Sequence, residues 1–182
     1  MSEIQVASRY AKSLIDLAEE QNSLEAVRSD ILSFIDTLHA NSTLQAVLKN
    51  PIISQHQKLN ILNELFASRF NKVILLFFKL LVSKGRSSVL YAIAKQFIVE
   101  YNIRKNIVQA TVTSAAVLSD TNKKRIEEVI KESTQGEVIL TAKVDPNLIG
   151  GFILKVGDKQ FDASLSSKLR NLKKQFNQKA IS

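Results

Sequence analysis

The chain has 182 residues, 45% of them hydrophobic and 23% charged, which suits one large folded domain or two small ones. It contains no cysteine, which excludes disulfides, thiol chemistry and zinc sites built on cysteine. The formal net charge of +8 permits nucleic acid, an anionic membrane or an acidic protein as a partner without choosing among them.

The first hundred residues have the pattern of successive helices with short connections. Over residues 5–21, apolar side chains at helical spacing cover an arc of roughly 180°, which is wider than one neighbouring helix needs. We therefore expect this helix either to be well enclosed or to share its apolar face between the core and a partner. Residues 70–83 are apolar on nearly every side, which is typical of the central helix of a bundle. The other helices are expected over 23–40, from Ser42 to Asn50, from Ser54 onward, and over about 87–104.

Start and stop signals separate these helices. Gly85 predicts a left-handed C-cap, and proline after Asn50 ends the short third helix, because the residue before proline disfavours helical dihedrals. Short helices with brief connections indicate a six-helix antiparallel-type bundle over residues 1–105. Three pairs have a spacing at which a side chain can satisfy a free backbone N–H at a helix start. They are Asn22 with Glu25, Ser42 with Gln45, and Ser54 with Gln57.

The pattern changes near residue 106, where β-branched residues begin to alternate. Ser119 or Asp120 is expected to cap a helix that runs to about Ser133. A tight hairpin turn is expected at 157–158. We therefore predict a mainly α fold, in which the helical bundle is followed by a small α+β domain over residues 106–182. Strands are expected over 107–113, 138–144, 150–156 and 160–162, and a basic amphipathic helix from 164 to about 178.

Nothing in the sequence predicts a membrane span or a secretion signal. The most apolar run, residues 73–82, is interrupted by Lys79 and is about half of the roughly 20 residues that a spanning helix needs. The N-terminus lacks a basic start followed by an apolar run. We expect a soluble cytoplasmic protein, which can still be peripheral to a membrane.

No catalytic or metal-binding constellation is present in the sequence. His39 and His56 lie in different predicted helices and have no carboxylate at ligand spacing. The adjacent glutamates at 19–20 and 127–128 diverge by about 100° on their helices, so neither pair can act as an acid/base couple. We expect no cofactor, no metal and no catalytic residue. An enzyme with an unusual site remains an alternative, and it requires a pocket that gathers carboxylates from separate segments.

Basic residues dominate the last twenty residues of the chain, and the first reading of them is a solvated face of the final helix. Nucleic-acid binding would favour exposed aromatic residues beside them, and only Phe176 lies near. A basic nucleic-acid-binding protein therefore stays an alternative, with binding that falls steeply as salt rises. Gly150 and Gly151, which enter a predicted strand, are read as permitting a bulge or a close backbone approach.

Four segments, in this order, resemble the ATP synthase delta subunits, known in mitochondria as the oligomycin-sensitivity-conferring protein family. They are ASRYAKSLIDLAEE, LVSKGRSSVL, VTSAAVLSD and DPNLIGGFILKVGDKQFDASLSSKLRNL. The resemblance is to the bacterial type and spans almost the whole chain. One position departs from the family, whose usual Asp-Gly-Ser is Asp162-Ala163-Ser164 here. Because alanine tolerates positive φ less well than glycine, we expect this turn to differ.

The resemblance implies a non-catalytic stator subunit of the rotary F-type ATP synthase. The helical part would bind N-terminal helices of alpha subunits, in a groove between the first and fifth helices. The C-terminal part would hold the b subunits of the peripheral stalk. The protein would then be peripheral, at the cytoplasmic face of the inner (plasma) membrane, touching the membrane only through the complex, with no nucleic acid bound.

The resemblance suggests candidate residues for both contacts, and the wide apolar arc over residues 5–21 agrees with the first of them. For the alpha subunit they are Tyr10, Ser13, Leu14, Leu17, Phe77 and Leu80. For the stalk they are Leu148, Ile149, Gly150, Gly151, Lys168, Arg170, Lys173 and Lys174.

Overall fold

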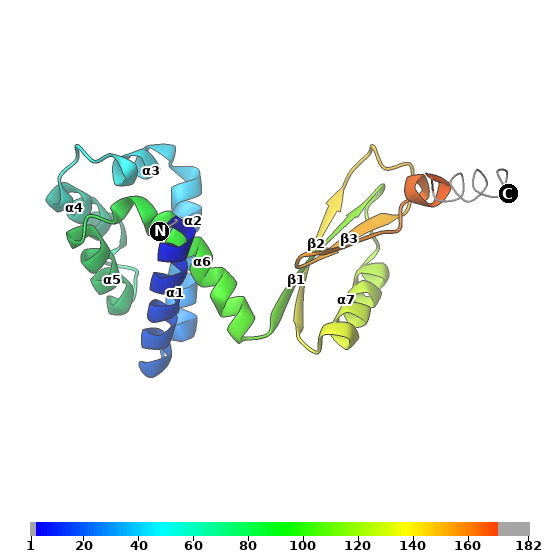
Figure 1. The fold of residues 1–182 in the computed structure, drawn as a ribbon, viewed down its shortest axis with the longest axis horizontal. Coiled ribbons are helices and arrows are strands. Elements are labelled where there is room, and N and C mark those ends of the chain that lie inside the picture. The colour runs from blue at the N-terminus through cyan, green and yellow to red at the C-terminus, as the bar shows by residue number, and fades with distance from the viewer. Residues whose placement is uncertain (1–2, 171–182) are drawn as a thin grey trace. The chain divides into compact units, whose positions relative to one another are not determined.

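A computed structural model describes residues 3–170 and divides the chain into two compact units, Met1–Asn102 and Ile103–Ser182. The prediction of a mainly helical chain with a small sheet near its C-terminal end is confirmed (Figure 1). The count of six helices in the first part is not confirmed, because a separate 3₁₀ helix precedes the last of them within the described residues. The bounds are α1 Glu3–Glu20, α2 Leu24–Ala40, α3 Ser42–Lys49, α4 Gln55–Phe66, α5 Lys72–Ser83, the 3₁₀ helix η1 Ser87–Val89 and α6 Leu90–Arg104.

Aromatic side chains form the centre of the helical core. The ring of Phe34 on α2 lies 4.7 Å from that of Phe78 on α5 and 5.5 Å from that of Phe66 on α4. Apolar spacing on α1 buries one side of that helix against the core, as expected. The core residues of α5 are Val73, Ile74, Phe77, Phe78, Leu81 and Val82.

α5 is apolar on nearly every side, as expected for a central helix, but not all of these residues are enclosed. Leu76 and Leu80 are exposed and Leu75 is half-buried. Since the buried and exposed sides of α5 both contain leucine, composition alone does not distinguish them.

One of the three predicted capping pairs is confirmed. Ser54 and Gln57 form a reciprocal capping box at the start of α4. The prediction at Ser42 is wrong, because α3 begins at this residue and its N-cap is Asn41. The Gln45 side chain donates instead to the backbone carbonyl of Leu38 on α2. The prediction at Asn22 is also wrong, because its φ of 51° places it in the left-handed turn after α1.

A buried lysine joins three segments of the helical unit. Lys58 on α4 is only 5% exposed, and its Nζ donates to the carbonyl oxygen of Leu48 at 3.1 Å and to Oγ of Ser87 at 2.9 Å. The Ser87 hydroxyl donates in turn to the same Leu48 carbonyl at 2.8 Å. This network fixes the end of α3 and the start of η1 against α4. The carbonyl lies at the negative end of α3, where a cation is stabilising.

The second unit contains a four-stranded sheet in the order β2-β1-β3-β4. β1 and β2 are parallel and are connected by α7, while β3 runs antiparallel to both β1 and β4. The predicted strands and the hairpin are confirmed, with Gly157 at a φ of 55° in the turn. The bounds are β1 Ile107–Ser114, α7 Asp120–Thr134, β2 Glu137–Val144, β3 Phe152–Val156 and β4 Lys159–Asp162.

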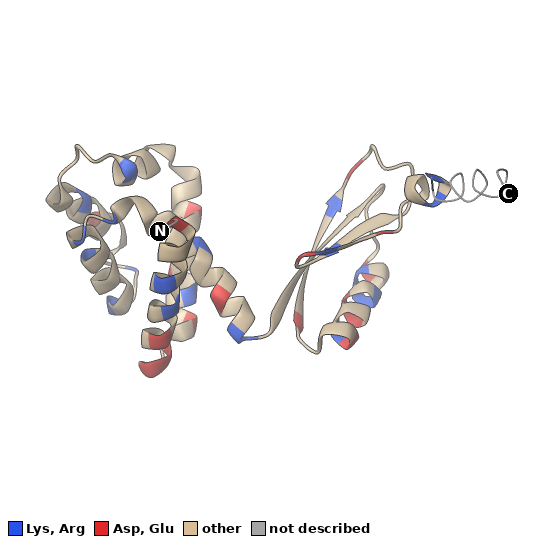
Figure 2. Ribbon diagram, viewed as in Figure 1, with Lys and Arg blue, Asp and Glu red and all other residues tan. Residues whose placement is uncertain are grey.

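α7 covers one face of this sheet next to β2, and Ser119 caps its start as predicted. Ile130 on this helix is buried, as are Ala110 and Val112 on β1. Basic and acidic residues are interspersed along α7 (Figure 2). The predicted final helix is present over residues 165–170, and its expected continuation lies outside the described residues. Within residues 3–170, every helix is too short or too polar to span a membrane.

Candidate partner-binding surfaces

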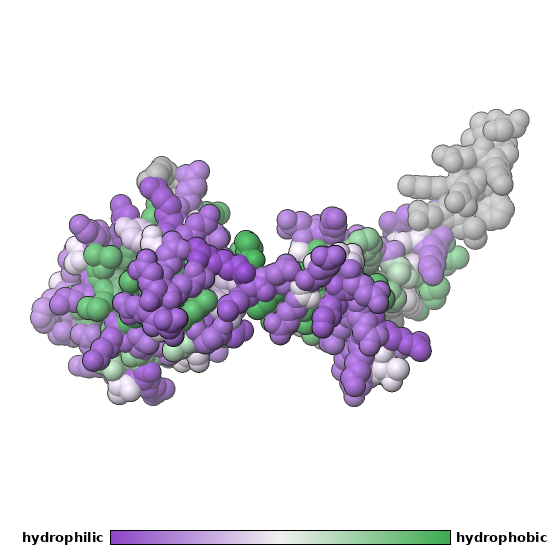
Figure 3. All heavy atoms as spheres, turned by 90° about the horizontal axis from the view of Figure 1, so that it is seen from below, coloured by the Kyte–Doolittle hydropathy of each residue, from purple (hydrophilic) through white to green (hydrophobic). Residues whose placement is uncertain are grey.

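Apolar side chains interrupt the otherwise hydrophilic surface of the helical unit (Figure 3). The rings of Tyr10 on α1 and Phe77 on α5 meet edge to face, with centroids 6.2 Å apart. Leu17 on α1 and Leu80 on α5 are exposed, as is the polar Ser13. The structure therefore brings together α1 and α5, as the resemblance implied. We call this surface the α1–α5 face, made of Tyr10, Ser13, Leu17, Leu76 and Leu80, with the buried Phe77 behind Tyr10.

Three residues change the predicted membership of this face. Phe77 is only 8% exposed and belongs to the core of α5, so it supports the ring of Tyr10 and is not itself at the surface. Leu14 is only 1% exposed and belongs to the core, so it supports the face from beneath and cannot touch a partner at the surface. Leu76 is exposed, and the sequence analysis did not include it. Its position four residues before Leu80 places both on the same side of α5, which is the signal that could have identified it.

Arg86 also contacts the tyrosine of this face. Its Nη1 donates to the hydroxyl of Tyr10 at 2.6 Å, and its guanidinium carbon lies 5.4 Å from the centre of the tyrosine ring. The backbone of Arg86 is fixed by Gly85, which ends α5 in the predicted left-handed conformation with a φ of 69°. The Arg86 N–H then donates to the carbonyl of Leu81 at 2.8 Å.

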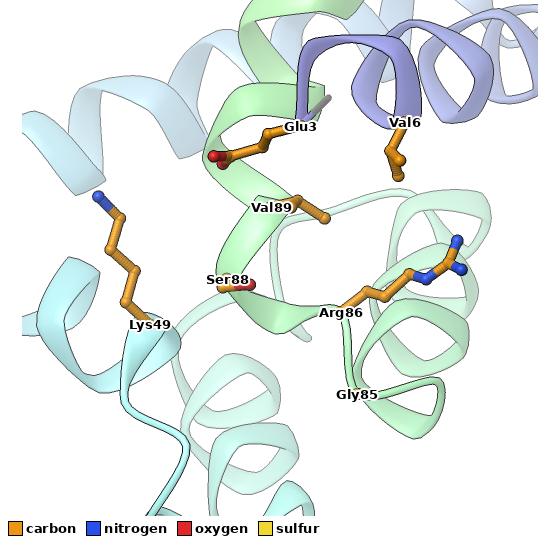
Figure 4. A pocket seen from close by; sticks show the side chains of 7 residues that line it. All are labelled: Glu3, Val6, Lys49, Gly85, Arg86, Ser88 and Val89. Atoms are coloured by element: carbon orange, nitrogen blue, oxygen red, sulfur yellow. The ribbon is translucent and has the colours of Figure 1, made fainter. Parts of the chain in front are cut away.

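Arg86 and Val6 both line two open cavities. The smaller, of about 250 Å³, runs along α1 past Tyr10 and Ser13. The larger, of about 610 Å³, extends to the end of α3 (Figure 4). The residues that line the larger cavity are Glu3, Val6, Lys49, Gly85, Arg86, Ser88 and Val89.

In the second unit, Gly150 and Gly151 allow the close backbone approach that the sequence predicted. Gly151 has a φ of 81°, and a Cβ there would lie 2.4 Å from the carbonyl oxygen of Ala163. The carbonyl of Gly150 accepts a hydrogen bond from the N–H of Leu165 at 3.0 Å. The glycine pair therefore fixes the start of the last helix. Of the two neighbouring candidates, Ile149 is exposed and Leu148 is half-buried.

The turn at Asp162 carries no strain from its alanine. The non-glycine residues with positive φ in the described part of the chain are Asn22, Asn106 and Gln135. Ala163 is not among them, so alanine fits this turn and the expected difference from a glycine-containing turn has no steric basis. The Asp162 carboxylate accepts from the N–H of Ser164 at 2.9 Å and from the hydroxyl of Ser167 at 2.6 Å. Hydrogen bonds from Ser164 and then Ser167 lower the pKa of Asp162 from 3.8 to about 2.

This pKa predicts how acid affects the turn. We expect the Asp162 carboxyl to titrate at about 2 in an NMR titration of the folded protein. Because the folded pKa lies below the unfolded one, the carboxylate stabilises the fold above about pH 4, and this contribution is lost as the pH falls toward 2. Asp162→Asn should remove that dependence, whereas Asp158→Asn in the exposed hairpin should not. A midpoint near 4 for Asp162 would contradict the hydrogen-bonded geometry.

Basic residues follow this turn at the surface. Lys168 and Arg170 are exposed on the described part of the last helix. Lys173 and Lys174 lie outside the described residues.

An apolar trough in the second unit was missed by the sequence analysis. It is a cavity of about 310 Å³ between α7 and the β3–β4 hairpin. Leu154 and Val156 lie half-buried at its base, and Val129 and Phe161 are exposed at its edges. Phe161 pairs directly with Leu154 across the hairpin, so both point to the same face of the sheet. The hairpin register was the signal that could have revealed it. We call this cavity the β3–β4 trough.

Comparisons with known proteins agree with the resemblance seen in the sequence. The family model described as ATP synthase delta (OSCP) subunit matches residues 6–176. ATP synthase subunit delta of Amoebophilus asiaticus is 40% identical over 176 residues, which cover 96% of each chain. The same subunit of Christiangramia forsetii is 37% identical over 93% of this chain and 91% of its own, and that of Cytophaga hutchinsonii is 34% identical over 100% and 99%.

The fold is also similar to a chain in the cryo-EM structure of the Toxoplasma gondii mitochondrial ATP synthase hexamer. The TM-score is 0.73 at 23% sequence identity, and the match covers 93% of this chain and 96% of that one. The family match and the bacterial relatives carry the assignment, and this likeness supports the fold. The chain belongs to the ATP synthase delta (OSCP) subunit family.

Proposed function

We propose that this chain is a non-catalytic stator subunit of the F-type ATP synthase. It links the alpha/beta catalytic head to the b-subunit peripheral stalk, so that proton-driven rotation is coupled to ATP synthesis. Membership of the ATP synthase delta (OSCP) family supports its place in the ATP synthase complex. The observation that carries the linking role is that each of the two compact units has its own partly apolar, unpartnered surface. The subunit then lies at the cytoplasmic face of the plasma membrane as a peripheral component.

The α1–α5 face is the surface that we assign to the alpha subunits, within the helical part at residues 1–105. An amphipathic helix binds by laying its apolar side into an apolar groove. Tyr10 offers ring surface here, backed by the buried ring of Phe77, and Leu17, Leu76 and Leu80 are exposed side chains that such a helix would cover. The N-terminal helix of an alpha subunit is the proposed occupant.

The stalk contact is assigned to the C-terminal part, residues 106–182. Ile149 and the basic Lys168 and Arg170 are exposed there, and the β3–β4 trough adds an apolar surface that a stalk helix can cover. A basic surface also speeds association with an acidic stalk helix. Nucleic acid is the less favoured partner, because basic and acidic residues are interspersed along α7, which leaves no continuous positive surface on this helix.

Calorimetric titration with a peptide from the alpha-subunit N-terminus of the same genome tests the proposal. We expect one-to-one binding by the full chain, weakened at least tenfold by Tyr10→Asp or Leu80→Asp, because a buried carboxylate would have no partner in the apolar contact. Leu65→Asp on α4 is the matched control, since Leu65 is 43% exposed and Leu80 is 48% exposed.

Two results would count against this assignment. If the folded wild-type chain does not bind the peptide, the groove is wrong, and salt-dependent binding to nucleic acid becomes the next test. If Leu65→Asp weakens binding as much as Leu80→Asp, the contact lies elsewhere on the helical unit.

A further inference from the structure

Arg86 has a fixed position beside the α1–α5 face, and the linking role alone does not explain it. Gly85 sets its backbone through the left-handed end of α5. The next residue, Ser87, is buried and hydrogen-bonded to Lys58. The Arg86 side chain itself is exposed, and beyond this fixed base its guanidinium group contacts Tyr10.

The guanidinium group of Arg86 has no carboxylate partner among residues 3–170. Its interactions are the hydrogen bond to the neutral Tyr10 hydroxyl and the contact with the tyrosine ring. Figure 4 shows its side chain extending toward the side of Val6, away from the carboxylate of Glu3 and the ammonium of Lys49. An arginine presents its N–H groups in a planar fork that matches a carboxylate. The Tyr10 hydroxyl accepts from one nitrogen of the guanidinium group, so other N–H groups of Arg86 can donate to a second acceptor.

The charges along this part of the chain have one sign. Between Glu64 and Glu100 the sequence contains no acidic residue. This stretch includes all of α5, η1 and most of α6. Its six basic residues are Arg69, Lys72, Lys79, Lys84, Arg86 and Lys95. Lys79, Lys84 and Arg86 are exposed in this stretch, so α5 and the turn after it carry only positive charge. A partner with negative charge beside its apolar residues complements this charge.

We propose that Arg86 receives a carboxylate of the partner helix that occupies the α1–α5 face. This inference rests on the proposed function and narrows the partner to an amphipathic helix of stated chemistry. Its apolar side covers Tyr10 and Leu80, and an aspartate or glutamate at the border of that side meets the guanidinium group. Arg86 then selects among apolar helices by charge, while the exposed leucines and Tyr10 supply the area of contact.

The test is calorimetry of the full chain with the alpha N-terminal peptide and with peptides in which each acidic residue is replaced in turn by its amide. Arg86→Gln is expected to weaken binding about fivefold, as loss of a well-formed surface ion pair does. One of the amide replacements should weaken binding to the wild type by a similar factor and leave binding to Arg86→Gln unchanged. The loss should shrink as salt rises, because the contact is exposed at its edge.

Two control variants separate this contact from other effects. Arg69→Gln makes the same charge change in the same acid-free stretch, and Arg69 lines neither cavity, so binding should be unchanged. Tyr10→Phe removes the hydroxyl that Arg86 binds and keeps the ring, so it measures how much of the loss comes from the tyrosine hydroxyl alone. If Tyr10→Phe reproduces the loss seen with Arg86→Gln, the arginine merely holds the tyrosine and the proposal is overturned.

The remaining outcomes are also decisive. Equal binding by Arg86→Gln and the wild type, or additive losses from Arg86→Gln and every amide replacement, would overturn the carboxylate contact while the proposed function stands. Absence of any binding by the folded wild-type chain would overturn the proposed function, and this inference with it.

Discussion

Gly151→Ala is expected to destabilise the C-terminal unit by about 3 kcal/mol or more, which is a large part of the stability of so small a unit. Two costs act together at this position. The backbone has a φ of 81°, which disfavours any L side chain, and the new Cβ would lie 2.4 Å from the Ala163 carbonyl oxygen and 2.9 Å from Cα of Ser164. Both neighbours are backbone atoms, so no side-chain rotation can relieve the clash.

Gly157→Ala isolates one of these costs and is the matched control. Gly157 also has positive φ, at 55°, but a Cβ there meets no atom within 4 Å. We expect it to cost only about 1 kcal/mol in chemical denaturation. Gly151→Ala should also abolish binding to the soluble region of the b subunit and leave binding to the alpha peptide intact. Equal stability of the two variants would show that the backbone contact with Ala163 contributes nothing.

Local sequence signals predicted the elements better than they predicted the surfaces. The β-branched run after residue 106 and the turn at 157–158 produced a sheet whose strands lie where alternation placed them. The capping spacing was right at Ser54 and wrong at Ser42, because a polar side chain near a helix start can bond to the preceding helix instead. Such a choice depends on the neighbouring helix, which periodicity does not reveal.

The α1–α5 face shows the same limit. Helical spacing put Leu14 and Leu17 on one apolar arc, yet the first is buried and the second is exposed, because the arc is shared between core and surface. The contact of Arg86 with Tyr10 joins residues that are 76 positions apart, and no local pattern encodes it. The resemblance to the family indicated the region of this face, but the identity of its exposed members required the packing of α5.

The buried Lys58 could not be found from the sequence, because a lysine on a helix is ordinarily solvated. We expect Lys58→Ala to lower the free energy of unfolding by about 3 kcal/mol. The substitution empties the space that its 5% exposed side chain fills, and it removes both hydrogen bonds to Leu48 and Ser87. Lys58→Met refills most of that space and should cost less, so the difference between the two variants measures the packing of the lysine stem.

Lys79→Ala on α5 is the control for this prediction, because Lys79 is exposed and its loss should leave the midpoint of urea unfolding unchanged. Since Ser87 directly follows Arg86, Lys58→Ala should also loosen the base of Arg86 and weaken binding of the alpha peptide, although no residue of the α1–α5 face is altered. Unchanged stability of Lys58→Ala would mean that the cost of burying an ammonium group without a carboxylate cancels its two hydrogen bonds and its packing. Retained peptide binding by a destabilised Lys58→Ala would instead show that Gly85 alone is enough to hold Arg86 in place.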